Sequence, residues 1–319
     1  MISDQDLLAQ TVRALVNKHA APAAVREAME SPRGYDESLW KLLCEQVGAA
    51  ALVVPDEFGG AGGDLGDAAT LVQELGRGLV PTPLLGTTLA ELALLSAPDK
   101  DKHKDTISRL ADGTAIGAVV FDEDYVINGD VADVVVAARD GQLTRWEKFT
   151  AHRVDTMDPT RRLARLRPLQ TTALGADPGL ADTAAILLAA EQVGAAERCL
   201  ELTVDYTKTR VQFGRPIGSF QALKHRMADS YVALSAARAV VDEAIADPTP
   251  ANAALARVTA TEAFCGVAAE GIQMHGGIAI TWEHDMQLYF KRAHGSAQLL
   301  GPVRDHLRRL APEVLNDKA

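Results

Sequence analysis

The stretch TRVQFGRPIGSFQ, residues 209–221, decides how the C-terminal half of the chain is organised. A helix that arrives at Arg210 cannot continue past Gly214 and Pro216, because proline lacks an amide hydrogen and clashes with the preceding turn. The sequence therefore predicts a tight corner that brings Arg210, Arg215 and backbone amides together. These groups suit an anionic ligand such as a pyrophosphate. An ordinary helix–turn–helix corner is the alternative, and the corner alone does not decide between them.

Long helical patterns lie on both sides of this corner. Apolar residues recur at helical spacing, and small residues such as Ala190 and Gly194 allow neighbouring helices to pack closely. The predicted helices cover residues 180–210, 220–246, 251–272 and 286–299. Four helices of this length, joined by short loops, predict a bundle.

The remaining sequence predicts two further domains. Residues 1–112 show helical periodicity. The sequence that follows contains short β-branched runs, which are bounded by Asp-Glu-Asp, Asn-Gly and Asp-Gly turns. We therefore expect a mainly α-helical protein with an N-terminal helical domain (1–112), a small β domain (113–178) and a C-terminal four-helix bundle (179–319). A glycine-rich loop after the apolar run 51–55 has some likeness to a dinucleotide-binding turn. No convincing parallel strands follow that loop, so we reject a Rossmann fold.

Composition narrows the classes of function. The formal net charge of −11 argues against nonspecific binding to nucleic acid. No apolar run reaches membrane-spanning length and the N-terminus is acidic, unlike a signal peptide, so we expect a cytoplasmic protein. The cysteines are far apart without zinc-ligand spacing, which predicts reduced thiols and no metal site. We interpret the scattered histidines of the C-terminal half as packing or surface residues: His225, His275, His284 and His294.

Several motifs resemble the acyl-CoA dehydrogenase family. In the C-terminal half they are RVQFGRPI (210–217) with FQ (220–221), QMHGGI (273–278), and WEHD (282–285) followed by LYFKRA (288–293). In the N-terminal half, VPDEFGG (54–60) and ELGR (74–77) are similar to the family's first helical domain. The similarity covers most of the chain. It implies a helical domain, a middle β domain and a C-terminal four-helix bundle through which the family forms dimers and tetramers.

The resemblance also implies a cofactor. In this family the corner and the Gln…Gly-Gly loop contact an FAD that is bound mainly by the neighbouring subunit. Carried over position by position, the residues assigned to the pyrophosphate and adenosine end of FAD are Arg210, Gln212, Phe213, Ile217, Gln221, Gln273, Gly276 and Gly277. Glycines suit this role because they let backbone amides approach phosphate.

The sequence departs from the family where the chemistry takes place. The family reaction needs a glutamate that removes the α-proton of an acyl-CoA while a hydride passes to the flavin. The two positions at which the family places that glutamate align with Leu300, just ahead of Gly301, and with Ala184. Neither side chain can accept a proton. The Thr-Glu-Pro…Gly-Ser-Asp loop that holds the flavin ring is also missing, because residues 119–121 run almost directly into 122–129.

These losses resemble the short, non-catalytic subunit of the heterotetrameric (α2β2) acyl-CoA dehydrogenases that actinobacteria use in steroid degradation. We therefore expect a chain that shares FAD with a longer partner subunit and is inactive alone. The resemblance implies a steroid-derived acyl-CoA as substrate and an electron-transferring flavoprotein as electron acceptor. Two alternatives stay open: a competent dehydrogenase that uses another acid such as Asp182, and a flavin-free interaction protein on a decayed dehydrogenase fold.

A few charged residues complete the set of candidates. Asp182 lies just ahead of the aligned base position, and we interpret it as the N-cap of the long helix rather than as a base. Glu191 and Glu197 are interpreted as packing or surface acids of the same helix. The adjacent Arg161 and Arg162 form either a solvated corner or partners for carboxylates of neighbouring loops, and we favour the solvated corner.

Overall fold

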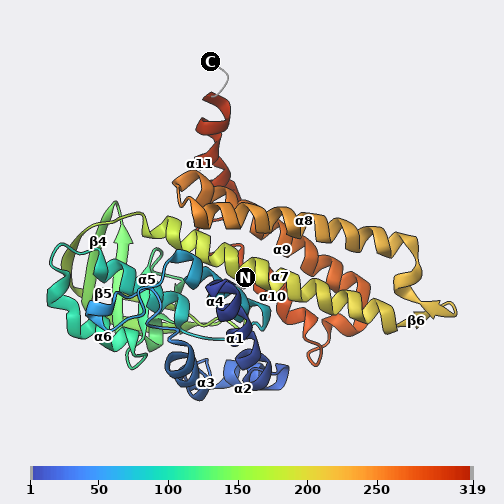
Figure 1. Ribbon diagram of the computed structural model, residues 1–319, viewed down its shortest axis with the longest axis horizontal. Helices are drawn as coiled ribbons and strands as arrows, with labels where there is room; N and C mark the ends of the chain where they lie inside the picture. The colour runs from blue at the N-terminus through green and yellow to red at the C-terminus, as the bar shows by residue number, and fades with distance from the viewer. Residues whose placement is uncertain (1–2, 317–319) are drawn as a thin grey trace.

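The computed structural model describes residues 3–316, and its N-terminal part is a cluster of helices (Figure 1). The α-helices are α1 (Asp4–His19), α2 (Pro22–Glu30), α3 (Glu37–Leu42), α4 (Leu65–Arg77), α5 (Leu84–Leu95) and α6 (Lys104–Ala111). Short π or 3-10 segments lie at η1 (Leu43–Val47), η2 (Asp56–Phe58) and η3 (Lys100–His103). Ser3 and Asp64 begin α1 and α4 with capping boxes, which satisfy amides that a helix start leaves free. The run 51–55 ahead of the glycine-rich loop forms turns rather than a strand, so the rejection of a Rossmann fold is confirmed.

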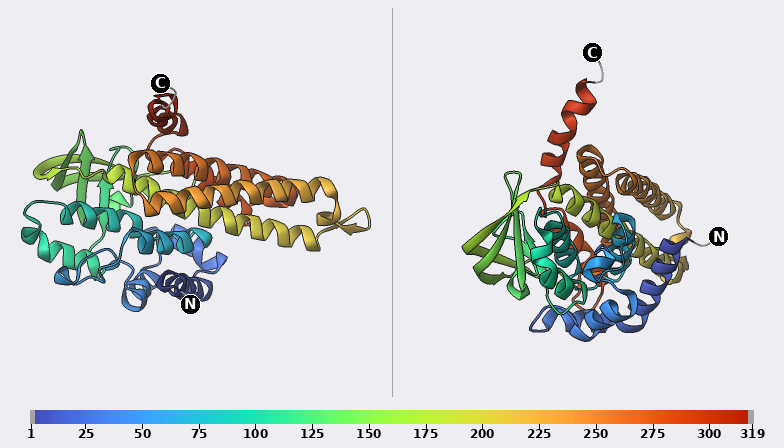
Figure 2. Two further views of the ribbon diagram at one scale, coloured as in Figure 1. Left: turned by 45° about the horizontal axis from the view of Figure 1, so that its top comes forward. Right: turned by 60° about the vertical axis from the view of Figure 1, so that its left-hand side comes forward.

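A small sheet follows, in the order β1-β3-β4-β5-β2. Its strands are β1 (Gly117–Val120), β2 (Val126–Ile127), β3 (Val134–Arg139), β4 (Gln142–Val154) and β5 (Leu163–Ala176), with the 3-10 turn η4 (Gly129–Val131) between β2 and β3. Only β1 and β3 pair in parallel. One face of the sheet packs on α5, as Figure 2 shows. The sheet curls until β2 lies near β1. Its inner face therefore holds a second small core that includes Val120, Val135 and Trp146.

The C-terminal half is a bundle of long helices. It contains α7 (Leu180–Thr209), the hairpin β6 (Val211–Gln212) and β7 (Arg215–Pro216), η5 (Ile217–Ser219), α8 (Gln221–Ala246), α9 (Pro250–His275), η6 (Gly276–Ile280), α10 (Met286–Ser296) and α11 (Val303–Asn316). The predicted fold class, mainly helical with a small β domain and a C-terminal bundle, is confirmed. The prediction missed α11, which begins after the last predicted helix and points away from the body (Figure 1). Within residues 3–316, every helix is too short or too polar to cross a membrane.

The N-terminal domain joins the bundle where α4 crosses α7. The two helices approach so closely that a Cβ atom on Gly76 would lie 2.3 Å from the carbonyl oxygen of Glu191. A Cβ atom on Gly194 would lie 2.0 Å from the carbonyl oxygen of Gln73. Because both clashes are with backbone, a side chain at either position forces the helices apart.

We predict that Gly194→Ala lowers the free energy of unfolding by about 3 kcal/mol, the upper range for overpacking a tight core. The control is Gly266→Ala in α9, where no atom lies within 4 Å of the added methyl group. There the better helix propensity of alanine stabilises by up to about 1 kcal/mol. Urea unfolding of both variants checks the pair; equal effects would contradict the close helix crossing.

One acid in the N-terminal domain is buried without a partner. Glu91 on α5 is 0% exposed, and in residues 3–316 neither of its carboxyl oxygens has a hydrogen-bond partner. Burial raises the pKa of Glu91 well above its ordinary value, so the side chain stays neutral in the folded protein. Because the unfolded chain releases this proton at lower pH than the folded chain does, Glu91 costs stability as the pH rises above about 4.5.

We therefore predict that Glu91→Gln raises the free energy of unfolding at pH 8, and that the gain shrinks towards pH 4.5. Each unit by which the carboxyl pKa is raised contributes about 1.4 kcal/mol at high pH. Chemical unfolding of both proteins between pH 4.5 and pH 8 measures the difference. A gain that does not depend on pH would show that Glu91 titrates normally.

Candidate functional site

The predicted corner is a hairpin at the far end of the bundle (Figure 1). β6 and β7 pair across a turn in which Phe213 and Gly214 have φ values of 52° and 76°. A left-handed conformation at Phe213 turns its ring outward, and the residue is 92% exposed. The backbone amide of Ile217 closes the corner by donating to the carbonyl of Arg210 at 2.8 Å. The corner that the sequence predicts is therefore present.

Two arginines of the corner have free charges. Among residues 3–316, neither Arg210 nor Arg215 has a carboxylate within 4.0 Å, although the chain is acidic overall. The guanidinium of Arg215 lies 4.0 Å from the ring centroid of Phe220, and that ring meets Phe213 edge-on with centroids 6.2 Å apart. The corner therefore offers positive charge beside aromatic surface, a combination that suits a phosphate joined to a base.

The second predicted stretch lies at the same end of the bundle. Tyr206, in the last turns of α7, donates from its hydroxyl to the carbonyl of His275 at 3.3 Å, and the two rings stack at 4.2 Å. His275 ends α9, and burial lowers the pKa of its imidazole. Gly276 follows with a φ of 69°, and the Cβ positions of Gly276 and Gly277 face open space. A ligand can therefore approach the backbone closely at both glycines, although the amide of Gly276 itself donates to the carbonyl of Ile272.

The assigned residues form a surface rather than a pocket. Seven are exposed: Arg210, Gln212, Phe213, Gln221, Gln273, Gly276 and Gly277, and only Ile217 is half-buried. A tightly held ligand usually loses most of its surface to its site. These residues can therefore fit one side of an extended anion such as the adenosine-pyrophosphate end of FAD.

The aligned base positions lie away from this surface. Ala184 is 1% exposed inside the first turns of α7, packed in the core. Leu300 has a φ of 60°, and its carbonyl is 3.1 Å from Nε2 of His306. The carbonyl of Leu299 accepts a hydrogen bond from the buried Arg257 at 3.0 Å. The loop is therefore held firmly, with an aliphatic side chain where a glutamate would have to stand.

The prediction that Asp182 caps the long helix is wrong. α7 begins at Leu180, so Asp182 lies inside the first turn. Asp177 performs the capping role, because its side chain accepts from the amides of Gly179 and Leu180 at 3.0 and 2.8 Å. Asp182 instead forms an ion pair with Arg309 of α11.

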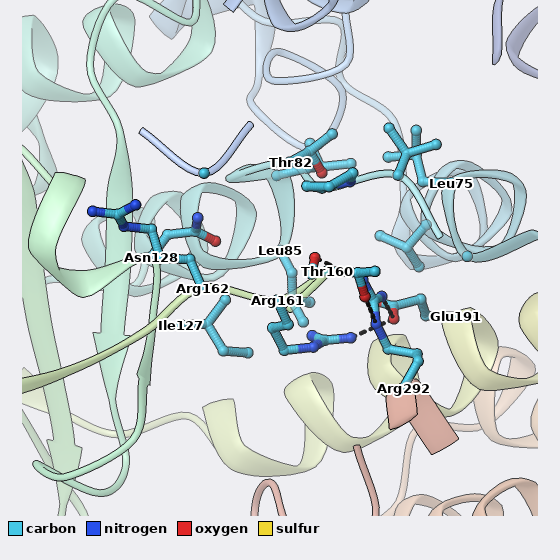
Figure 3. A pocket seen from close by; sticks show the side chains of 16 residues that line it. Leu75, Thr82, Leu85, Ile127, Asn128, Thr160, Arg161, Arg162, Glu191 and Arg292 are labelled. Atoms are coloured by element: carbon cyan, nitrogen blue, oxygen red, sulfur yellow. Dashed lines mark hydrogen bonds and ion pairs between the residues drawn. The ribbon is translucent and has the colours of Figure 1, made fainter. Parts of the chain in front are cut away.

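The prediction of a solvated corner at Arg161 and Arg162 is also wrong. Arg161 is 9% exposed and pairs with Glu191 of α7, while Arg162 donates to Asp130 at 2.8 Å. Figure 3 shows Arg161 and Arg292 converging on Glu191 from different elements. No sequence signal reveals these pairs, because the partners lie 30 and 101 residues apart along the chain.

This charge cluster fills the place where the three domains meet. Arg292 of α10 donates to Glu191 at 2.6 Å and is paired with Asp158 at 2.9 Å. Burial opposes a charge on Glu191, but the two arginines outweigh it and hold its pKa below the ordinary value. The remaining cavity is about 30 Å³, room for about one water molecule. Glu191 is thus a bound counterion and not a free base.

Comparisons with known proteins identify the family to which the chain belongs. Residues 179–314 match the model of the acyl-CoA dehydrogenase C-terminal domain, and residues 3–114 match that of the N-terminal domain. The chain belongs to the acyl-CoA dehydrogenase family. Members of this family are FAD-dependent flavoproteins that oxidise CH–CH bonds.

Proteins of similar sequence and proteins of similar structure both match this chain over nearly their whole length. The acyl-CoA dehydrogenase IpdE2 of Mycobacterium tuberculosis is 70% identical, over 98% of this chain and 97% of the relative. A variant of the Tcur3481–Tcur3483 steroid ACAD is 26% identical with a TM-score of 0.88, covering 98% of each chain. The ChsE4–ChsE5 complex from Mycobacterium tuberculosis shares the fold at 24% identity, with a TM-score of 0.87 over 100% of this chain and 99% of that chain.

We predict that Glu191→Gln destabilises the protein by about 3–5 kcal/mol, because it removes the counterion of the buried Arg161 and one of the two carboxylates that pair with Arg292. The stabilisation from Glu191 is present above its unfolded pKa of about 4.5 and is lost as the pH falls through the lower folded value. The matched control, Glu197→Gln, removes a half-exposed acid of the same helix and costs about 1 kcal/mol or less. Thermal unfolding at pH 7 and pH 4 tests both points, and similar effects of the two variants would contradict the cluster's role.

Proposed function

We propose that this chain is the subunit of a heteromeric acyl-CoA dehydrogenase that completes its partner's FAD site without supplying a catalytic base. One observation carries the proposal. The chain keeps an exposed, positively charged surface suited to the adenosine end of FAD, while Ala184 and Leu300 occupy both positions where a base would be needed. A homo-oligomer of such a chain would hold a cofactor end without any group to remove the α-proton.

The partner in this proposal is a longer acyl-CoA dehydrogenase subunit in an α2β2 heterotetramer. It would supply the flavin-ring site and the glutamate. Two similar structures support a second kind of subunit, because each name joins two different chains. They are the Tcur3481–Tcur3483 steroid ACAD and the ChsE4–ChsE5 complex. The word steroid in the first of these names supports a steroid-derived CoA thioester as the substrate. An electron-transferring flavoprotein is the proposed electron acceptor.

When bound, FAD supplies the hydride acceptor, and the chain's own residues act only at the other end of that molecule. Arg210 would neutralise the pyrophosphate, and the amide of Gly277 would donate to one of its oxygens. Phe213 would add apolar surface beside the adenine, while Gln212, Gln221 and Gln273 offer polar groups to the adenosine. Asp182 is a poor substitute base because Arg309 neutralises it.

The visible flavin spectrum tests the proposal. The chain purified alone should be colourless, and the chain co-purified with a longer acyl-CoA dehydrogenase subunit should be yellow with one FAD per pair. An acyl-CoA should bleach only the complex. Stoichiometric FAD in the chain alone, bleached by an acyl-CoA, would contradict the proposal and favour a competent enzyme with another base.

We predict that Arg210→Ala weakens the affinity of the complex for FAD at least about tenfold, and so lowers its FAD content when FAD is limiting, because a charged contact to a phosphate oxygen contributes about 1.5–3 kcal/mol. The control is Arg153→Ala, an exposed arginine of β4 in the sheet domain, which should leave the flavin content unchanged. Absorbance at the flavin maximum, measured per mole of complex, decides the outcome. Unaltered flavin in the Arg210 variant would mean that this surface does not bind FAD.

A further inference from the structure

A cavity of about 360 Å³ lies between the N-terminal domain and the bundle. Its walls come from α1, α2 and the end of α4 on one side, and from α7 and α10 on the other. Figure 1 shows α1, α4, α7 and α10 next to one another near the middle of the molecule. Small-molecule sites have volumes of about 300–1,000 Å³, so this cavity is large enough to hold a small ligand.

Much of the cavity wall is apolar. The apolar side chains that line it are Val16, Ala20, Val25, Leu79, Leu202 and Leu288. Leu202 is half-buried and the others are buried. Because these side chains come from both the N-terminal domain and the bundle, a ligand with an apolar body would contact both at once.

The backbone at Leu79 is strained. This residue follows α4 with a φ of 49°, and its amide donates to the carbonyl of Gly76 at 3.0 Å. Glycine is the usual residue at such a left-handed position after a helix, because a Cβ atom is disfavoured there. Leucine therefore costs free energy at this place, while its side chain forms part of the cavity wall. Strained residues of this kind cluster at ligand-binding and catalytic sites.

Two arginines of the cavity have N–H groups without a partner among residues 3–316. Arg13 donates from Nε and Nη2 to Glu74 at 2.8 and 2.6 Å, which leaves Nη1. Arg198 donates from Nη1 to Glu201 at 3.0 Å, which leaves Nε and Nη2. These groups can donate to a ligand, and the bonds are stronger when the acceptor is negatively charged.

The two acids that line the cavity already have cationic partners. Both oxygens of Glu74 accept hydrogen bonds from Arg13, and Asp285 is paired with Arg26 at 2.9 Å. A ligand with a positive end would have to compete with these arginines for a carboxylate. The lining therefore favours a ligand whose polar end is an anionic acceptor.

We propose that this cavity binds a small amphipathic carboxylate. Its apolar body contacts Leu79, Leu202 and Leu288, and its carboxylate accepts hydrogen bonds from Arg13 and Arg198. Because the ligand contacts both domains of the folded chain, its binding stabilises that state over the unfolded one. The cavity shares no residue with the surface assigned to FAD, so the inference does not rest on the proposed function.

Titration of octanoate into the purified full-length chain tests the inference. Isothermal titration calorimetry should show one saturable site per chain, and octanoate should raise the melting temperature of the protein. Octylamine, which has an apolar tail of similar length and the opposite charge, should show no saturable binding. No saturable binding of octanoate, or equal binding of octylamine, would overturn the proposal.

Variants of the wall locate the bound octanoate. Leu202→Trp and Val25→Phe add volume from the bundle and from the N-terminal domain, and each should abolish binding because it fills the cavity. Arg198→Met keeps an unbranched apolar side chain but removes the donors, so it should weaken binding at least about tenfold. The matched control is Arg304→Met, an exposed arginine of α11 outside the cavity, which should leave binding unchanged.

The variants also define the contrary results. Full binding in a folded Leu202→Trp or Val25→Phe protein would place octanoate elsewhere and overturn the inference. Unchanged affinity in Arg198→Met would show that the carboxylate is not held by this arginine, which contradicts the proposed geometry. Arg198 is not a core residue, so this variant keeps the test decisive if a filled variant does not fold.

Discussion

The structure depends on the close crossing of α4 and α7. Gly76 and Gly194 let the two backbones touch, and the same crossing presses α4 against Glu191. Glu191 in turn holds an arginine from the sheet domain and one from α10. This contact therefore links the N-terminal domain, the sheet and the bundle to one another. The helix crossing and the ion pairs of Glu191 depend on each other. A wider spacing of α4 and α7 would admit water to the buried charges, and water would weaken their pairing.

The buried charges have a consequence for function. Two arginines and two carboxylates are costly to remove from water, and their mutual ion pairs offset that cost. They occupy the meeting place of the three domains and leave room there for about one water molecule in a cavity of 30 Å³. Binding surface is left instead at the far end of the bundle, where no carboxylate of residues 3–316 pairs with Arg210 or Arg215.

Much of this architecture could be predicted from the sequence, for local reasons. The helices follow from apolar spacing, and the corner follows from Gly214 and Pro216, which act on their immediate neighbours. The errors concern residues whose environment is made by distant parts of the chain. Arg161 is buried because Glu191 lies opposite it. Asp182 does not cap the helix because Asp177 accepts the hydrogen bonds of the amides at the helix start. The assigned FAD residues lie at one end of the bundle and form one exposed surface there.

The exposure of that end decides how the chain can act. A flat surface with two arginines and two exposed glycines attracts an anion, yet on its own it leaves most of a large cofactor in water. In the proposed function a second surface supplies the remaining affinity, and binding of the cofactor and binding of the partner then strengthen each other, as linkage between two ligands of one site demands. The base positions support the same proposal from the side of the chemistry, since neither Ala184 nor Leu300 can accept a proton. The proposed subunit therefore depends on its partner for both the cofactor and the reaction.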